Sequence, residues 1–315
     1  MHSVLTIGGA TRDMYLTIPA QETVLSTSHG EKINATGLAH HVGGGAANAA
    51  ISFARQGLKT GICAVVGADD AGLQIRTTLR HENVDTALLF SHSTEPTATS
   101  VVLKTNDGQS TIIAYRGSAS TLGTQWLSSP HLASYTNAYL AALSNQAIPL
   151  LPTIALSLRS RYRLLTCNPG SAQLTSTHIG YFYDSLASLD IVMMNQREAI
   201  TCAQALGQTA LAPRQLASVL LSRGPSLVVI TNGKQGAYAY TATESHYAPS
   251  QAAVVVDTVG AGDAFCSSFV AALIQRKSIQ DALRLGSIQS AAAVAMIGGT
   301  TGLLHANELA AHPTL

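Results

Sequence analysis

The segment that most constrains this chain is residues 252–269, where a β-branched stretch, a glycine turn, a single carboxylate and an apolar helix follow one another. The small and β-branched residues 252–256 predict a buried strand. Gly260 and Gly262 then allow a tight turn that opens a helix continuing to about Arg276. This succession of strand, turn and helix is typical of an α/β fold.

The start of that helix is suited to binding an anion. The first backbone amides of a helix have no intrahelical partner and the helix dipole makes this end positive, so Gly260, Ala261 and Gly262 are predicted to bind a phosphate or another oxyanion. Asp263 lies in the same turn, close enough to accept a proton from an attacking group. An acidic residue also stabilises an ordinary helix start by up to about 1 kcal/mol, but two glycines around one alanine exceed what a cap requires. The motif favours phosphoryl transfer.

The composition excludes several classes of protein. With 315 residues, of which 46% are hydrophobic, the chain is long enough for one large α/β unit with an appendage. Its 18 Lys and Arg against 17 Asp and Glu leave a net charge of +1, which gives no global attraction to nucleic acid or to an anionic membrane. We see no basic leader before a long apolar stretch and no apolar run of about 18 residues, so we expect a soluble, cytoplasmic protein.

Neither the cysteines nor the paired histidines indicate a metal site. The four cysteines contain no Cys-x-x-Cys pair and are expected to be reduced, buried side chains. His40 and His41 are adjacent, and neighbouring side chains of a strand point to opposite faces, so both cannot easily bind one metal. We interpret them as loop or strand-end residues.

Along the chain, short β-branched runs alternate with stretches of helical period. The predicted strands are residues 4–7, 61–66, 163–167, 190–194, 227–231 and 254–257. The predicted helices include residues 46–55, 71–82, 211–223 and 264–275. This alternation indicates a parallel sheet with helices on both faces.

Two polar, β-prone stretches interrupt the alternation. The first is residues 14–42, and the second predicts strands at 99–105 and 110–115 joined by a turn at 106–108. Because they flank the first βαβ region, we expect them to pair into one small sheet that covers a cleft as a lid. The predicted division is a large α/β domain of residues 1–12, 43–96 and 118–315 and a discontinuous β lid of residues 13–42 and 97–117.

Two glycine-rich motifs, GGGAANAA at residues 43–50 and DTVGAGD at residues 257–263, resemble the paired signatures of the ribokinase-like, or PfkB, family of carbohydrate and nucleoside kinases. Three further matches, at residues 65–72, 195–198 and 231–236, follow in the family's order, so the resemblance spans nearly the whole chain. It implies a three-layer α/β sandwich with a mainly parallel, doubly wound sheet and a small β-sheet lid.

The resemblance assigns a sugar site to the N-terminal half. Asp13 matches the family's acidic residue that accepts hydrogen bonds from sugar hydroxyls, a task suited to an ionised carboxylate. Gly43 and Gly44 would let a polyol approach the backbone closely, and Asn48 offers both a donor and an acceptor. The alternatives are a turn residue at Asp13 and a plain loop-to-helix joint at the glycines.

The resemblance also assigns a nucleotide site. In the family, Asn195 and Glu198 would act near Mg²⁺ and the nucleotide phosphates, largely through water, although a capping box gives the same spacing. Thr231 and Gly233 close a strand at the sheet edge where open α/β sheets bind ligands, and they are expected to line the phosphates and ribose. Gly236, in the same motif, is either a nucleotide-binding residue or a turn glycine.

The remaining family positions lie near the C-terminus. Asp257 and the carbonyl of Val259 resemble a monovalent cation site, for K⁺, that backbone from the loop after Ala295 would complete. Carbonyl ligands leave almost no trace in side-chain identity. Gln289 and residues 291–302 are expected to border the adenine.

The implied reaction is transfer of the γ-phosphoryl group of ATP, with Mg²⁺, to a primary hydroxyl of a sugar or nucleoside. Asp263 would take the hydroxyl proton while the Gly260–Gly262 anion hole stabilises charge on the transferred group and the lid excludes water. A nicotinamide dehydrogenase does not fit, because Asn48 and Phe265 stand where its third glycine is required. A catalytically silent sugar or nucleotide sensor on the same fold is the other alternative.

The sequence leaves the substrate open. Arg116, in the lid, either recognises the carboxylate of an acid sugar such as 2-keto-3-deoxygluconate or is a solvated charge. Ribose-specific members place a glutamate near the strand at residues 139–143, whereas residues 144–146 are Ser-Asn-Gln here. Ribose- or fructose-like sugars, acid sugars and nucleosides (adenosine, inosine or pseudouridine) all fit. The exposed lid strands also predict a homodimer.

Overall fold

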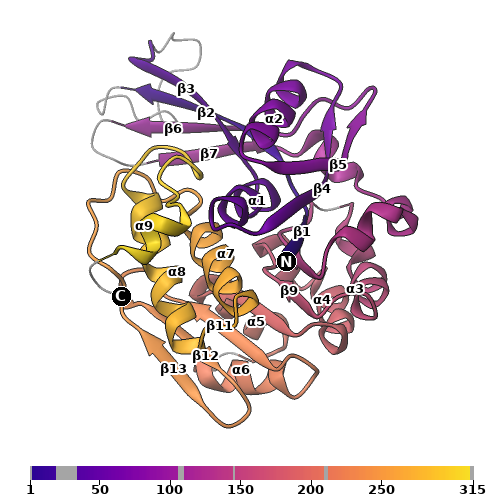
Figure 1. Cartoon of the computed structure of the whole chain (residues 1–315), viewed down its shortest axis with the longest axis vertical. Helices are drawn as coiled ribbons and strands as arrows, with labels where there is room; N and C mark the ends of the chain where they lie inside the picture. The colour runs from indigo at the N-terminus through magenta and orange to yellow at the C-terminus, as the bar shows by residue number, and fades with distance from the viewer. Residues whose placement is uncertain (1, 19–33, 106–109, 145, 209–211, 313–315) are drawn as a thin grey trace.

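The computed structural model describes residues 2–18, 34–105, 110–144, 146–208 and 212–312, which form a large sheet with helices on both faces and a small sheet projecting from one end (Figure 1). The strands are β1 (Ser3–Ile7), β2 (Thr11–Ile18), β3 (Gly37–Gly43), β4 (Lys59–Gly67), β5 (Val84–His92), β6 (Thr99–Thr105), β7 (Ser110–Tyr115), β8 (Asn137–Leu140), β9 (Leu164–Cys167), β10 (Ile191–Asn195), β11 (Leu227–Thr231), β12 (Ala237–Tyr240) and β13 (Ser245–Ala248). The α-helices are α1 (Gly45–Arg55), α2 (Asp70–His81), α3 (Leu151–Arg159), α4 (Ile179–Ser185), α5 (Gln196–Ala205), α6 (Pro213–Leu221), α7 (Ala261–Ile274), α8 (Ile279–Val294) and α9 (Ala306–Ala310).

The large sheet is doubly wound. Its strand order is β13-β12-β11-β10-β9-β8-β1-β4-β5, and all neighbours are parallel except at the antiparallel β12 and β13 end. The chain first moves outward from β1 to β4 and β5, and then returns to β8 and continues in the other direction. Open α/β sheets bind ligands at the carboxyl ends of the strands where the order reverses, here between β1 and β8. The predicted fold class is confirmed.

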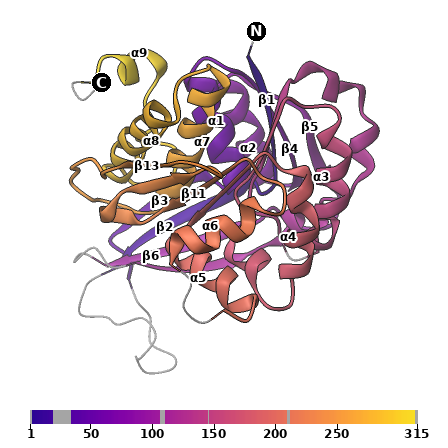
Figure 2. The same ribbon diagram turned by 90° about the horizontal axis from the view of Figure 1, so that it is seen from below.

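Helices cover both faces of this sheet, so the fold has three layers (Figure 2). Along β4, Ile62 and Ala64 belong to the core under α1, α2, α7 and α8, whereas Cys63 and Val65 belong to the core under α3 to α6. This alternation follows from the two-residue period of a strand. None of the helices in the described ranges is long and apolar enough to span a membrane.

The small sheet has the order β3-β2-β6-β7 and joins the two separated β-prone stretches, as predicted. Its strands begin at Thr11 and reach Gly43, slightly beyond the predicted lid segment; the division into domains itself stays a prediction. The predicted turn at residues 106–108 and part of residues 14–42 lie outside the described residues. Leu38, Ile112 and Ile113 are exposed on this sheet, and the homodimer stays a prediction.

The predicted strand at residues 254–257, with the buried stretch 252–256, is wrong. These residues form no strand, and the Val254 side chain is 81% exposed. The sheet ends at β13, and the segment is instead fixed to helix α8, because the amides of Val256 and Asp257 both donate to the carbonyl of Val294, at 2.8 and 3.1 Å. β-branched residues without a neighbouring strand to pair with do not make a strand.

Asp69 ties the start of α2 to the small sheet. Its Oδ1 accepts a hydrogen bond from the amide of Gly72 at 2.8 Å, and its Oδ2 accepts one from the amide of Thr97 at 2.8 Å. Burial alone would raise the pKa of Asp69, but the hydrogen bonds from Thr97 and Gly72 outweigh it and hold this pKa below its ordinary value.

We expect Asp69→Ala to lower the free energy of unfolding by about 0.5–2 kcal/mol at neutral pH, the usual cost of losing an N-cap. Because the folded-state pKa is depressed, this contribution is present at neutral pH and is lost as the pH falls through the folded-state pKa. Urea unfolding at neutral and acidic pH measures both effects. Asp70→Ala, one residue later in the same helix, is the control, and an equal loss in the two variants would contradict the capping role.

Candidate active site

The two glycine-rich motifs meet where α1 and α7 begin. Gly260 is the N-cap of α7 and has φ 81°, a left-handed conformation that favours glycine. Asp263 lies in the first turn of that helix, and its Oδ2 accepts a hydrogen bond from Asn48 Nδ2, in the first turns of α1, at 2.8 Å. The carboxylate is therefore held by a residue 215 positions earlier in the chain rather than capping its own helix.

Burial raises the pKa of Asp263, and the nearby charge of Asp13 raises it further, while the hydrogen bond from Asn48 lowers it. A carboxylate with a raised pKa is a stronger base than an ordinary aspartate. It lies beside the first amides of α7, of which that of Ala261 donates to the carbonyl of Thr258 at 3.3 Å. A carboxylate and a set of backbone donors thus occupy the same turn.

A buried polar seam fixes α1 against α7. Ser267 Oγ donates to Ser52 Oγ at 2.7 Å, and Ser268 Oγ donates to Gln56 Oε1 at 3.1 Å. Ser52 and Gln56 follow Asn48 at intervals of four residues, so they lie on the same face of α1. Because each buried polar group needs its partner, the seam favours one register of the two helices. That register is the one that brings Asn48 to the carboxylate.

Asp13 lies on β2 of the small sheet and is buried, with His41 of β3 and Ser100 of β6 as its strand neighbours. Its Oδ1 accepts hydrogen bonds from Thr11 Oγ1 at 2.9 Å and from Ser100 Oγ at 2.5 Å. Burial raises the pKa of Asp13, although these hydrogen bonds oppose the shift. Its Oδ2 lies directly over Gly43, where a Cβ would be 1.9 Å away. Only glycine at position 43 leaves room for this carboxylate.

A cavity of about 580 Å³ opens beside the N-terminus of α7. It is lined by the residues predicted for nucleotide binding on β10, β11 and the turn after it, by α7 and α8, and by the segment 250–258 before α7. The lining includes Asn195, Thr231, Gly233, Gly236, Ala261, Gly262, Phe265, Ser287, Ser290, Ala291 and Val294. Ala261 and Gly262, at the start of α7, therefore border this cavity, and Asp263 follows them in the same turn.

Comparison with known proteins shows the family of the chain. The profile of the pfkB family of carbohydrate kinases matches residues 1–306. The chain belongs to the pfkB family. It is accordingly a phosphotransferase of the carbohydrate kinase type.

Individual relatives of this pfkB kinase are distant but cover nearly all of it. It is 25% identical over 309 residues to ribokinase of Haemophilus influenzae, with 96% of both chains covered. It is 28% identical over 293 residues to 5-dehydro-2-deoxygluconokinase of Shouchella clausii, with 86% of both chains covered. The structure of Arabidopsis thaliana ribokinase complexed with ribose and ATP has a TM-score of 0.83 at 22% identity and 98% coverage of both chains, which shows the shared fold.

Asn195 and Glu198 form a capping box at the start of α5 in the kinase. The amide of Asn195 donates to Glu198 Oε2 and the amide of Glu198 donates to Asn195 Oδ1, both at 2.9 Å. Burial raises the pKa of Glu198, and the nearby charge of Asp263 adds to the rise. Asn195 and Glu198 therefore do form the capping box that was the alternative interpretation. In this position Glu198 is close enough to Asp263 for the two charges to interact.

Asp257 organises the loops around Gly260. Its Oδ1 accepts from the amide of Val259 and its Oδ2 from the amide of Gly298, both at 3.1 Å. Both carboxylate oxygens thus bind backbone amides of the surrounding loops. Neighbouring carbonyls such as that of Val259 are the candidate ligands for a monovalent cation. That cation site stays a prediction.

Gln289 and Arg116 are not among the residues that line the 580 Å³ cavity. Gln289 is fully buried, where its Nε2 donates to the carbonyl of Leu304 and its Oε1 accepts from the amide of Leu304, both at 3.2 Å. Its side chain therefore does not line the cavity, whereas Ser290 and Ala291 beside it do, and a place for Gln289 at the adenine stays a prediction. Arg116 is exposed at the end of β7, and its contact with substrate stays a prediction.

His41 lies beside Asp13, which the sequence analysis did not predict: it interpreted His40 and His41 as loop or strand-end residues, and both lie inside β3. It pairs with Asp13 across β2 and β3, and its positive charge would lower the pKa of Asp13. Its ring packs edge-on against Tyr15, with 5.4 Å between centroids, and its Nδ1 lies 3.3 Å from Thr301 Oγ1. His41 and Gly43 are two residues apart and so lie on the same face of a strand, which could have placed His41 near the sugar site. Using this signal required knowing that both residues belong to one strand.

Proposed function

We propose that this kinase transfers the γ-phosphoryl group of ATP to a primary hydroxyl of a sugar held between Asp13 and Asn48. The observation that carries the proposal is the 2.8 Å hydrogen bond from Asn48 to Asp263 at the amino end of α7. It puts a carboxylate of raised pKa beside the first amides of α7, close to the charge of Asp13 and to a cavity of about 580 Å³ that Ala261 and Gly262 line. The acceptor site, the base with its neighbouring amides, and the nucleotide cavity are then each formed by separate residues.

Asp13 and Asn48 orient the sugar, because a carboxylate accepts from hydroxyls and an amide both accepts and donates. Asp263 accepts the proton of the attacking hydroxyl while the new oxygen–phosphorus bond forms and the bond to the leaving ADP oxygen breaks. The amides of Gly260, Ala261 and Gly262 stabilise the negative charge on the transferred group. The small sheet is proposed to act as a lid that keeps water from replacing the sugar.

The donor set fits Mg²⁺ bound mainly through phosphates and water. No cluster of three or more His, Cys, Asp or Glu suited to holding a metal occurs in the described ranges, and Glu198 offers one carboxylate near Asp263. Mg²⁺ retains several waters and commonly binds through one or two carboxylates plus phosphates. When bound with ATP, it would neutralise charge on the phosphates.

The substrate class is proposed from the relatives and from the acidic sugar pocket. The similar proteins named above are ribokinase and 5-dehydro-2-deoxygluconokinase, so a ribose-like or fructose-like sugar or a keto-deoxy sugar acid is the proposed acceptor. We expect sugar-dependent ADP release in a panel of ribose, fructose, 2-keto-3-deoxygluconate, adenosine, inosine and pseudouridine, each with and without K⁺. Turnover only with nucleosides would replace the sugar assignment. Tight binding without any turnover would indicate a silent sensor.

A further inference from the structure

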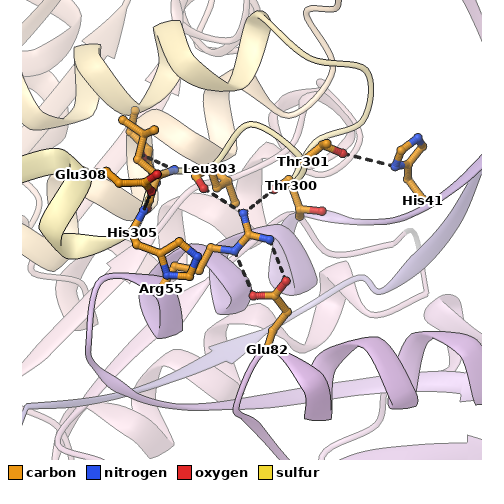
Figure 3. Close-up of polar contacts among 10 residues, drawn as sticks. His41, Arg55, Glu82, Thr300, Thr301, Leu303, His305 and Glu308 are labelled. Atoms are coloured by element: carbon orange, nitrogen blue, oxygen red, sulfur yellow. Dashed lines mark hydrogen bonds and ion pairs between the residues drawn. The ribbon is translucent and has the colours of Figure 1, made fainter. Parts of the chain in front are cut away.

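Arg55, the last residue of α1, holds a loop that packs behind the anion site. Its Nη1 donates to the backbone carbonyls of Thr300 at 2.9 Å and Leu303 at 2.8 Å. Its other edge forms a bidentate ion pair with Glu82, with Nε to Oε2 at 2.9 Å and Nη2 to Oε1 at 2.7 Å (Figure 3). One guanidinium thus joins the carboxyl ends of α1 and α2 to the loop between α8 and α9.

Glu82 fixes the direction in which Arg55 points. The two side chains are only 15% and 19% exposed, so water screens the pair weakly. The hydrogen bond from Arg55 holds the pKa of Glu82 below its usual range. Because a guanidinium is planar and both carboxylate oxygens are engaged, the remaining donor can point only at the two carbonyls. A lysine ammonium has no such fork.

Gly299, directly before Thr300 in the loop, packs behind the proposed anion site. A Cβ on Gly260 would lie 2.5 Å from the Cα of Gly299, and a Cβ on Gly299 would lie 3.0 Å from Asn48 Nδ2. Gly299 is thus packed against both the turn that opens α7 and the amide that donates to Asp263. A shift of this glycine removes support from both at once.

Within the described residues, the loop's own backbone hydrogen bonds are long, and at its start the amide of Gly298 donates to Asp257 Oδ2 at 3.1 Å. The amide of Thr301 donates to Gly298 at 3.4 Å and that of Leu303 to Thr300 at 3.3 Å, both long for such bonds. From the small sheet, His41 contacts Thr301 at 3.3 Å (Figure 3). The charge-assisted bonds from Arg55 are shorter, and hydrogen bonds of this kind are roughly twice as strong as neutral ones.

We infer that Arg55 is a positioning residue for phosphoryl transfer: its guanidinium, oriented by Glu82, holds the 298–303 loop so that Gly299 supports Gly260 and Asn48. The inference rests on the proposed function in taking the start of α7 as the site of the reaction. Arg55 lies seven residues after Asn48 in α1, so the helix that contacts the base also carries the anchor of the wall behind it.

The test compares Arg55→Gln and Arg55→Lys with Arg159→Gln as a matched control. Arg159 is likewise the last residue of a helix, α3, and forms an ion pair with Asp190, but it lies away from the site. We expect Arg55→Gln to lower kcat by about 10- to 100-fold, as small misplacements remote from the chemistry do. The KM values for sugar and ATP should change little, and Arg55→Lys should recover only part of kcat. Arg159→Gln should leave kcat unchanged.

Hydrogen exchange of the ligand-free protein supplies a readout that does not depend on turnover. We expect Arg55→Gln to speed exchange in residues 296–304 and in residues 257–263 but not elsewhere, and Glu82→Gln to do so more weakly. Unchanged exchange in both segments overturns the inference, and so does a normal kcat in a variant whose loop exchanges faster. If the wild-type protein turns over no acceptor, the proposed function fails, while exchange in residues 257–263 still decides whether Arg55 supports the anion site.

Discussion

Asp263→Asn is expected to lower kcat by about 10²- to 10⁴-fold, the usual contribution of a general base. The asparagine carbonyl can still accept the hydrogen bond that Asn48 donates at 2.8 Å in the wild-type protein. Sugar and nucleotide KM values should therefore remain near those of the wild-type enzyme. Steady-state kinetics with the accepted sugar, together with a melting curve, separate loss of the base from loss of the fold.

Asp281→Asn is a matched control for this variant. Asp281 is the third residue of α8, as Asp263 is of α7, but it pairs with its own N-cap, Ser278, whose hydroxyl donates to its Oδ2 at 2.6 Å. We expect this substitution to cost only a modest amount of helix stability and no activity. Turnover of Asp263→Asn within a few-fold of the wild-type rate would remove Asp263 as the base.

The pH dependence follows from the raised pKa of Asp263. The base must be ionised, so kcat/KM should fall as the pH drops through that raised pKa. For stability the sign is opposite: a folded-state pKa above the unfolded value means that stability is lost as the pH rises through it. Asp263→Asn should then be at least as stable as the wild-type protein at neutral pH. A less stable variant would contradict this account of the buried charge.

The sequence predicted the parts of the site that lie in one motif and not those that depend on which strands pair. The glycine turn, the helix start and the carboxylate at residues 260–263 are local, and glycine conformation and helix-end chemistry specify them. The strand predicted at 254–257 was wrong because pairing is a tertiary property. The partners of Asp13 were missed for the same reason, since Ser100 reaches it only through the parallel pairing of β2 and β6.

Side-chain chemistry alone also could not separate a ligand contact from a packing contact. Gln289 has the donors and acceptor of an adenine-binding residue, yet it uses them on the backbone of Leu304. Arg55 shows the reverse, because it sits in an apolar helix as an apparent terminal charge but reaches backbone 245 residues later in the chain. Every residue has a backbone carbonyl, so the sequence does not indicate which carbonyls a distant side chain will bind. Such contacts can be recognised only from the three-dimensional position of the loop.

Gly43→Ala is expected to abolish most sugar recognition while leaving ATP binding intact. The new Cβ would lie 1.9 Å from Asp13 Oδ2 and 2.4 Å from its Cγ, far inside any real contact distance. The carboxylate cannot yield cheaply, because Thr11 and Ser100 both hold its Oδ1. Turning it away forfeits two hydrogen bonds from sugar hydroxyls to a charged group, worth about 1.5–3 kcal/mol each. At 1.4 kcal/mol per tenfold, kcat/KM for the sugar should fall by about two to four orders of magnitude.

The substitution should weaken sugar binding and leave ATP binding unchanged. Gly43 is not among the residues that line the cavity proposed for the nucleotide. Gly37→Ala, at the other end of β3, is the matched control: its Cβ would meet only the side chain of Thr17, at 3.1 Å. Direct binding of ATP and of sugar to both variants, measured by calorimetry, divides the outcomes. Unaltered sugar affinity in Gly43→Ala would mean that Asp13 does not bind the acceptor, whatever Asp263 does. Equal losses of sugar and ATP affinity would instead point to a disturbed fold. A displaced Asp13 side chain could weaken ATP binding only by also disturbing the amides of α7.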